Sequence, residues 1–462
     1  MPGRHKLAGC LSKAFGKVNK FLLYNLSAER SFRTNLITLG APSGIYFSIT
    51  VPNMTRKQYF ITVLILGTLS TISPFAIDMY LPGFPAIATD LHTSISQIQL
   101  SLTSYLVGIS VGQLLYGPLL DRFGRKYPLY LGLVIYLLAS LGCAATNSVE
   151  TLIGMRFLQA IGGCVGMVAA QALVRDLFPV NQTAQVFSLL TLVIAVSPMI
   201  APTVGGYITA SFGWHYVFII LAVITAIILI GTFFFLPQGK EPDPTLSLRP
   251  KAVISSFLAV LKQPQFFVYA LVGGIGSAAP FAYIAGSPDV FMNIYKVSEQ
   301  EYGWIFAVLA FAMIGSTQLN HILLRKYKSE QIILVTLLYQ TATGLLLVLG
   351  TWAGWYGQYG LISLMFIFLT GQGLVNPNAS ALSLAPFTRH AGSAAALMGS
   401  FRMGVGGLVS AAVSVLHNNT ALPMVGMMTA CAVFGLFFLL IGKKRAQYKP
   451  EEADTEVSPV GV

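Results

Sequence analysis

Long apolar runs separated by short polar segments make up most of this chain. About twelve of these runs are long enough to cross the ~30 Å hydrocarbon core of a bilayer as helices rising ~1.5 Å per residue. The expected spans are 59–80, 97–120, 127–146, 151–173, 183–208, 213–236, 266–287, 301–324, 330–350, 358–384, 391–416 and 420–441. The pattern predicts an all-α polytopic membrane protein with about twelve transmembrane helices.

Composition supports the membrane assignment and excludes other classes of protein. Hydrophobic residues make up 55% of the 462 residues and charged residues only 10%, too few to cover the surface of a soluble protein. The four cysteines lie far apart and match neither a disulfide framework nor a metal-ligand spacing, so no metal is expected. The net charge of +12 does not indicate nucleic-acid binding, because the basic residues gather between the spans.

The basic residues also orient the chain. If successive connections lie on opposite sides of the membrane, Lys296 alone falls on one side and the other loop lysines and arginines fall on the opposite side. The positive-inside rule then places both termini in the cytoplasm. Two arginines, Arg156 and Arg402, remain inside predicted helices.

A charged segment between the second and third spans is the most specific motif of the chain. It reads Gly117-Pro118-Leu119-Leu120-Asp121-Arg122-Phe123-Gly124-Arg125-Lys126. A simple stop-transfer cluster would need neither its two glycines nor its acid. The segment resembles the loop between the second and third helices of major facilitator superfamily transporters. The resemblance implies a gating motif made of Gly117, Asp121, Arg122, Gly124, Arg125 and Lys126.

In that family the segment is thought to act electrostatically. The resemblance implies that Asp121 lies near the positive end of a neighbouring helix and that Arg125 finds a carboxylate in the same half. Such contacts would hold the cytoplasmic gate closed in the outward-open state. A degraded second-half copy ends at Arg325 and has Leu324 in place of the acid, so we expect a one-sided latch.

The predicted cytoplasmic linker at 237–263 divides the spans into two sets of six. The expected domains are an N-terminal half at 54–236, a C-terminal half at 264–442 and a cytoplasmic tail at 443–462. Weak internal similarity supports a duplication, because Phe75-Ala76-Ile77-Asp78 followed by Pro82 matches Phe281-Ala282-Tyr283-Ile284 followed by Pro288. Two six-helix halves are also the repeat architecture of the superfamily that the motif resembles.

Residues 1–53 form a basic extension outside this pattern. They lack the apolar core and cleavage site of a secretory signal. As a helix they would place lysines opposite apolar residues, and such a helix could lie on an anionic membrane surface. The alternative, which we favour, is that Met54 begins the native protein and the extension is translated upstream sequence.

Three ionisable residues within the spans are candidates for transport chemistry. Asp78, near the end of the first span, is expected to face a cavity or a partner, and burial would favour its protonated form. It could bind proton and substrate at different times, or it could only cap the helix. Arg156 needs a permanent acceptor, which could be Asp78, backbone carbonyls or a substrate group, unless its role is structural. Arg402 could face the central cavity or snorkel towards the cytoplasm.

The fifth span carries a proline and glycine motif that bears on the direction of transport. Pro198 and Pro202 remove two backbone donors and should bend the helix, while Gly205 and Gly206 let a neighbouring backbone approach. The stretch resembles the antiporter motif of the drug-efflux branch, with Ser197 and Ala201 in place of the usual glycines. Together with Asp-Met-Tyr-Leu-Pro at 78–82 and Phe-Arg-Met-Gly at 401–404, it resembles the bicyclomycin-resistance (Bcr/CflA) subfamily. This resemblance covers about 54–445.

Aromatic side chains within the spans could contact a flat or amphipathic substrate. We name Tyr80, Tyr105, Phe281 and Tyr283 as candidates for the proton and substrate site beside Asp78, Arg156 and Arg402. The alternative for each is ordinary packing or a position at the membrane interface. The chain has no Gly-x-x-x-x-Gly-Lys-Ser/Thr motif, so it contains no P-loop ATPase.

The residues and the resemblance together lead to one expected function. We expect proton-driven export of small drug-like molecules by alternating access, with no cofactor, in the bacterial inner membrane. Drugs or metabolites, protons and membrane lipid are the expected partners, and the chain is expected to be a monomer. Proton-coupled transport of a metabolite is the alternative. A multispanning membrane enzyme is a remote alternative, because it needs a convergent catalytic set that this sequence does not offer.

Overall fold

The computed structural model describes residues 55–245, 248, 250–387 and 391–442. The N-terminal extension and the C-terminal tail expected from the sequence lie outside these residues. The described residues form helices and no strand. Their bounds are α2 Arg56–Asp78, η1 Leu81–Gly83, α3 Phe84–Asp90, α4 Ile95–Phe123, α5 Lys126–Ala144, α6 Val149–Leu177, α7 Val180–Phe212, α8 His215–Phe235, α9 Pro250–Leu261, α10 Pro264–Gly276, α11 Ala279–Pro288, η2 Asp289–Ile294, α12 Glu299–Leu323, α13 Ser329–Ala353, α14 Gln358–Thr370, α15 Gln372–Leu384, α16 Ala391–Val415 and α17 Leu422–Gly442.

Twelve helical segments among the described residues are long and apolar enough to cross a membrane. The predicted fold class and number of spans are therefore confirmed. The seventh span was predicted to end at residue 287, and this is wrong, because the helical segment runs over Pro264–Ile294. It continues past Pro288 as one stretch of π-helix, η2, which keeps Asp289 inside the span.

Serine and threonine side chains begin several of these helices. Thr55 and Gln58 form a reciprocal capping box at the start of α2, and Ser298 and Glu301 do the same at the start of α12. Ser94 accepts a backbone hydrogen bond at the start of α4. Each cap satisfies amide groups that the first helical turn leaves without a partner, which fixes where these spans begin.

The first span is not a continuous helix. The α-helix ends at Asp78, a short turn follows at Tyr80, and the 3₁₀-helix η1 carries Pro82 near its start. Proline lacks the backbone donor that a helix interior requires. The chain therefore turns just after Asp78, which leaves the carboxylate at the end of α2 rather than in the middle of a helix.

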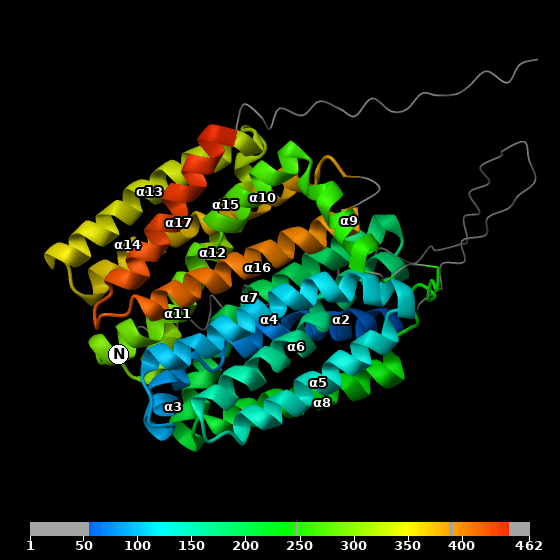
Figure 1. Ribbon diagram of the computed structural model, residues 1–462, viewed down its shortest axis with the longest axis horizontal. Helices are drawn as coiled ribbons and strands as arrows, with labels where there is room; N and C mark the ends of the chain where they lie inside the picture. Colours follow the sequence, from blue (N-terminus) through cyan, green and yellow to red (C-terminus); the bar gives the residue numbers. More distant parts are fainter. Residues whose placement is uncertain (1–54, 246–247, 249, 388–390, 443–462) are drawn as a thin grey trace, which may run out of the picture. The chain divides into compact units, whose positions relative to one another are not determined.

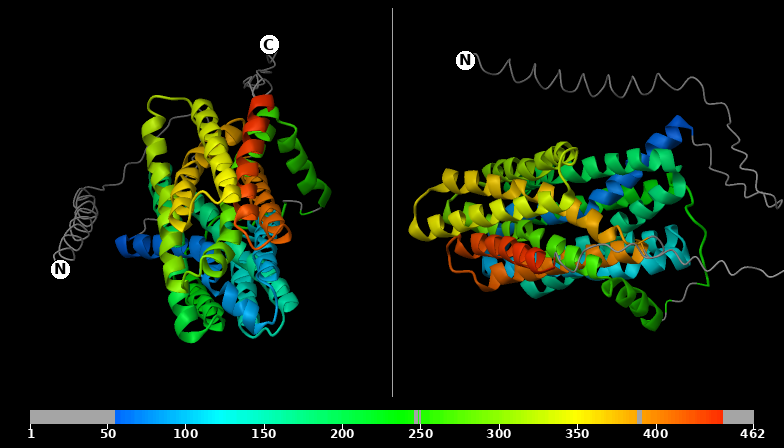
Figure 2. Two further views of the ribbon diagram at one scale, coloured as in Figure 1. Left: turned by 90° about the vertical axis from the view of Figure 1, so that its left-hand side faces the viewer. Right: turned by 90° about the horizontal axis from the view of Figure 1, so that it is seen from above.

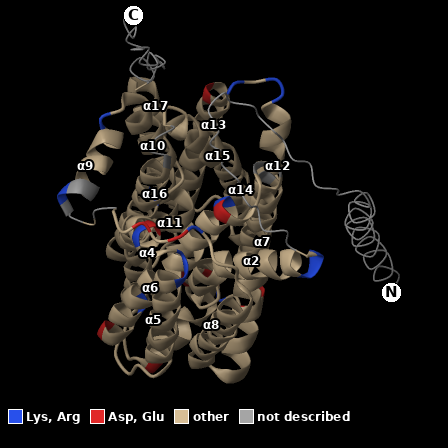
Figure 3. Cartoon of the chain, turned by 90° about the vertical axis from the view of Figure 1, so that its right-hand side faces the viewer, with Lys and Arg blue, Asp and Glu red and all other residues tan. Residues whose placement is uncertain are grey.

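The helices form two six-span halves that pack side by side (Figure 1). The spans Arg56–Asp90 to His215–Phe235 make the N-terminal half, and Pro264–Ile294 to Leu422–Gly442 make the C-terminal half. Figure 2 shows the same helices from two further sides. Charged residues gather at helix ends and connections (Figure 3). We call the membrane face at residues 117–126 the motif face and the opposite one the Asp289 face.

Two helix pairs make most of the contact between the halves, α4 with α16 and α7 with α12. Hydroxyl groups run along the α4–α16 contact. Thr103 Oγ1 lies 2.9 Å from Ser410 Oγ, and Ser110 Oγ donates to the Ser400 carbonyl oxygen at 2.8 Å. Towards the Asp289 face, η1 also touches α12, and α3 touches η2. The contacts between the halves are therefore extensive at the Asp289 face.

Two glycines of α7 allow the closest approaches at that face. A methyl group on Gly205 would clash with the Met79 carbonyl oxygen just after α2. A methyl group on Gly206 would lie 2.5 Å from the Glu299 carbonyl oxygen at the start of α12. The pair thus lets α7 lie against the end of the first span and against the other half at once.

We expect Gly205→Ala to destabilise the protein by roughly 1–3 kcal/mol, the usual cost of forcing extra atoms into a packed region. Gly231→Ala is the matched control, because no heavy atom lies within 4 Å of its added methyl group. The measurement is the apparent melting temperature of each purified variant in detergent. Equal melting temperatures for the two alanine variants would contradict the close approach.

Candidate functional site

Arg156 lies in α6 and is fully buried, with an exposure of 0%. Its Nη1 donates to Gln159 Oε1 at 2.6 Å, and its Nη2 donates to the Ala76 carbonyl oxygen of α2 at 2.9 Å. Gln159 is held in turn, because its Nε2 donates to Ser140 Oγ at 2.7 Å. These bonds tie α6 to α2 and α5 and supply acceptors without any carboxylate.

Aromatic rings provide the rest of the environment of this guanidinium. Its central carbon lies 4.2 Å from the ring centre of Tyr80 and 4.1 Å from that of Tyr105. The ring of Phe218 follows at 5.7 Å. The negative faces of aromatic rings attract a cation, and the attraction grows when water is excluded. Tyr80 and Tyr105, named from the sequence as possible substrate contacts, thus stabilise Arg156 in this structure.

Asp78 is also buried, with an exposure of 4%. Among the described residues, no hydrogen bond or ion pair joins its carboxylate to another side chain, and it does not pair with Arg156. It lies within electrostatic range of Tyr283 and Tyr302 of the C-terminal half. A buried carboxylate without a partner is costly while charged. Asp78 is therefore a group that can take up a proton where the two halves meet.

The charged motif forms a compact network at its own face. Arg125 donates to Asp176 Oδ2 and to Asp121 Oδ1, both at 2.7 Å. Burial alone would lower the pKa of Arg125, but the hydrogen bonds from this side chain to Asp176 and Asp121 raise it above its ordinary value. The resemblance implied a carboxylate partner for Arg125 in the same half, and Asp176 of α6 occupies that place.

The segment after α8 covers this network. The Lys240 backbone nitrogen donates to Asp176 Oδ2 at 3.0 Å, and that of Asp243 donates to the Asp121 carbonyl oxygen at 3.2 Å. Gly124 adopts a φ of 79°, a conformation that glycine tolerates, and lies beside Pro242. These two backbone hydrogen bonds connect the linker to the motif and to Asp176.

Other motif positions take different places. Gly117 has open space beside it, so no close packing requires a glycine there. Arg122 lies 5.9 Å from the ring centre of Phe123, and Lys126 begins α5. In the second-half copy, no ion pair is formed by the described residues around Leu324.

The proline and glycine motif belongs to the contact between the halves. Pro198 and Pro202 lie inside α7, and Thr203 Oγ1 donates to the Gly303 carbonyl oxygen of α12 at 3.3 Å.

The other residues that were predicted to bind the proton or the substrate lie in the C-terminal half. Tyr283 stacks on Phe306 with ring centres 5.1 Å apart, and the ring of Phe281 lies against Gly406 of α16. Arg402 contacts Asn376 of α15.

Comparison with known proteins places this arrangement in a family. The model of the Major Facilitator Superfamily matches residues 66–411. The chain belongs to the major facilitator superfamily. Its similarity to the bicyclomycin resistance protein homolog of Haemophilus influenzae reaches 33% identity over 381 residues, 82% of this chain and 96% of the relative.

Further relatives are also named for drug resistance. The chloramphenicol resistance protein of Pseudomonas aeruginosa is 30% identical, over 80% of this chain and 88% of its own length. Multidrug resistance protein D of Escherichia coli is 28% identical over 84% and 96%. A bacterial homologue of the human lysosomal transporter Spinster superposes with a TM-score of 0.64 at 16% identity, covering 86% of this chain and all of that structure. This last likeness shows the fold alone.

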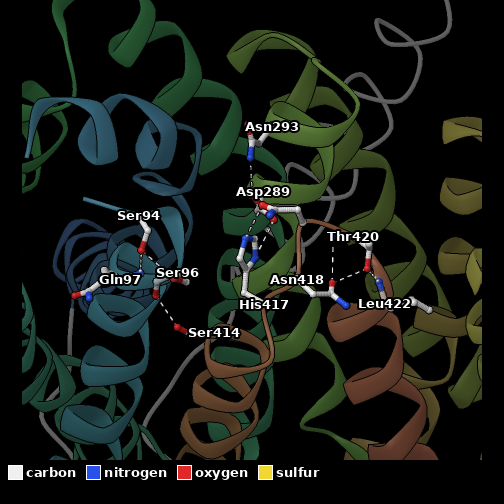
Figure 4. A network of polar contacts seen from close by, with 11 residues as sticks. Ser94, Ser96, Gln97, Asp289, Asn293, Ser414, His417, Asn418, Thr420 and Leu422 are labelled. Carbon is white, nitrogen blue, oxygen red and sulfur yellow. Dashed lines mark hydrogen bonds and ion pairs between the residues drawn. The ribbon is translucent and has the colours of Figure 1, made fainter. Parts of the chain in front are cut away.

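One polar network of this superfamily member escaped the sequence analysis (Figure 4). The side chain of Asp289 is 3% exposed, and its Oδ2 lies 3.3 Å from Nδ1 of His417. His417 belongs to the loop between α16 and α17. Asn293 Nδ2 donates to Oδ1 of Asp289 at 3.1 Å. Close by, Ser414 Oγ donates to the Ser96 carbonyl oxygen of the N-terminal half. Asp289 was missed because the seventh span was expected to end just before Pro288. The signal in the sequence was a charged residue with apolar residues on both sides.

We expect Arg156→Lys to lower stability by roughly 1–3 kcal/mol although the charge is kept. The planar guanidinium donates to Gln159 and Ala76 and also contacts both tyrosine rings. The compact ammonium group of lysine cannot make this whole set of contacts. Arg175→Lys, at the exposed end of the same helix, is the control. Thermal unfolding of the purified variants is the measurement. If the two lysine variants melt together, the planar guanidinium is not required.

We expect Asp176→Ala to release the linker from the motif face. The substitution removes the acceptor of both Arg125 and the Lys240 backbone, so trypsin should cut after Lys240 several-fold faster. Glu150→Ala, at the opposite end of α6, removes a carboxylate remote from the network and should leave the rate unchanged. The rate is measured on the purified full chain, and equal rates for both variants would show that Asp176 does not hold the linker.

Proposed function

We propose that this chain exports small drug-like molecules across the bacterial inner membrane in exchange for protons. The observation that carries the proposal is Asp78, a buried acid at the junction of the two halves that forms no ion pair with any described side chain. Membership in a superfamily of transporters, with relatives named for resistance to bicyclomycin and chloramphenicol, supports drugs as substrates. The chain acts as a transporter rather than an enzyme and needs no cofactor beyond the proton gradient.

The position of Asp78 suggests how proton binding is coupled to movement. The carboxylate belongs to α2, while Tyr283 and Tyr302 in its surroundings belong to α11 and α12 of the other half. Separation of the halves at the Asp289 face would admit water to the carboxylate and favour its charged form. Closure would favour the protonated form, because a buried charge without a partner is costly. Proton occupancy and closure of this face thus depend on each other.

The contacts between the halves assign a state to the structure. They are extensive at the Asp289 face, where α7 lies against both α2 and α12. If the basic loops mark the cytoplasm, this face is external and the transporter is closed to the outside. Both termini then lie in the cytoplasm. In the outward-open state, Gly205 and Gly206 would leave the close contacts that they make here.

The test is drug accumulation in an efflux-deficient bacterium that expresses the full chain. We expect cells with the wild-type chain to accumulate less chloramphenicol or bicyclomycin, and an uncoupler to abolish the difference. Asp78→Asn should abolish it as well, because an amide cannot take up and release the proton. Glu150→Gln, an exposed acid with the same change of charge, should export normally.

Each other result has its own meaning. Export that survives Asp78→Asn places proton coupling at another group. Export that survives the uncoupler contradicts proton coupling itself. No effect on either drug contradicts drug export and favours transport of a metabolite.

A further inference from the structure

The two intramembrane arginines have different surroundings. Arg156 has two oxygen acceptors and two aromatic rings around it, so it is stabilised by the protein itself. Arg402, in α16, has a single acceptor among the described residues, Asn376 Oδ1 at 3.1 Å. A guanidinium offers five N–H donors and no acceptor. Most of the donors of Arg402 are thus left for a group that the described chain does not supply.

A cavity of about 30 Å³ lies directly beside Arg402. Three helices of the C-terminal half line it, and its polar lining residues are Tyr269, Asn376, Ser380 and Arg402. Its lining contains no aspartate or glutamate. The cavity is lined by none of the described acids of the C-terminal half, which are Asp289, Glu299, Glu301 and Glu330. The electrostatics of the cavity therefore favour an electron-rich ligand group.

The size of the cavity limits what can enter it in this state. A drug-sized ligand needs a site of roughly 300–1,000 Å³. The cavity beside Arg402 has room for one functional group of such a ligand. A planar group with two oxygens matches the fork of a guanidinium and can accept two parallel hydrogen bonds from it. Resting on the proposed export function, we propose that Arg402 binds a nitro or carboxylate group of the transported molecule.

The cavity also touches the N-terminal half. Gly399 lines it, and a methyl group on Gly399 would clash with Gln113 Oε1 of α4. The next residue, Ser400, accepts the hydrogen bond from Ser110 of α4. A group bound to Arg402 therefore lies at the contact between α4 and α16, which changes when the halves move. Binding there is sensitive to which face of the transporter is open.

Direct binding to the purified full chain in lipid nanodiscs tests this inference. The probes are chloramphenicol, which carries an aryl nitro group, and the analogue in which that group is an aryl amine. We expect the wild type to bind the nitro compound about tenfold more tightly, the difference expected from one hydrogen bond to a charged group. Arg402→Gln should remove this preference, and Arg402→Lys should restore only part of it. Arg175→Gln, which removes an exposed arginine, should leave the preference unchanged.

Two results with the wild type would overturn the inference: equal binding of both probes, and binding of neither. A preference that survives in Arg402→Gln would overturn it too. Equal loss of both probes in Arg402→Gln would assign the arginine a structural role and would also overturn it. If the chain exports drugs but shows no Arg402-dependent preference, the proposed function stands and the Arg402 site is rejected. A preference without uncoupler-sensitive export keeps the Arg402 site alone.

Discussion

The N-terminal half is organised around a positive charge that no water reaches. A guanidinium keeps its charge inside a protein, so the groups around Arg156 must replace water as its surroundings. It does so with two oxygen dipoles and two tyrosine rings drawn from α2, α4 and α6 and the turn after α2. These groups converge only when the helices are packed in this one arrangement. The need to stabilise this charge therefore helps to specify how the helices of the half pack.

That solution leaves Asp78 without a countercharge among the described residues. A direct ion pair between Arg156 and Asp78 would have held both groups charged throughout the transport cycle. The Ala76 carbonyl oxygen instead satisfies the arginine two residues before the acid. Asp78 then lies at the end of α2, where the turn containing Pro82 brings it against the other half. On the proposed function, this separation is what leaves the acid able to bind and release a proton.

Hydropathy is a property of whole segments, which is why twelve spans and an all-α fold could be predicted from the sequence. Single residues were harder to place. Pro288 suggested the end of a span, but the chain continues as a π-helix and carries Asp289 into the packed region. The sequence did not show which acceptor binds Arg156, because contacts with aromatic ring faces and backbone carbonyl groups have no sequence signature. The role of Tyr80 and Tyr105 beside it depends on tertiary packing, which hydrophobic periodicity does not encode.

The two halves differ in the surroundings that they give to an arginine within a span. Among the described residues, Arg156 of the first half has two oxygen acceptors and two tyrosine rings around it. Arg402 of the second half has one amide partner beside a small cavity. A ligand with an electron-rich group would give Arg402 further acceptors, as the tyrosine rings and two amide oxygens do for Arg156. Proton binding and ligand binding would then use different halves, so neither needs to displace the other directly. Their exchange would be coupled through the contacts of α4 with α16 and of α7 with α12, which both sites adjoin and which every opening of the transporter must rearrange.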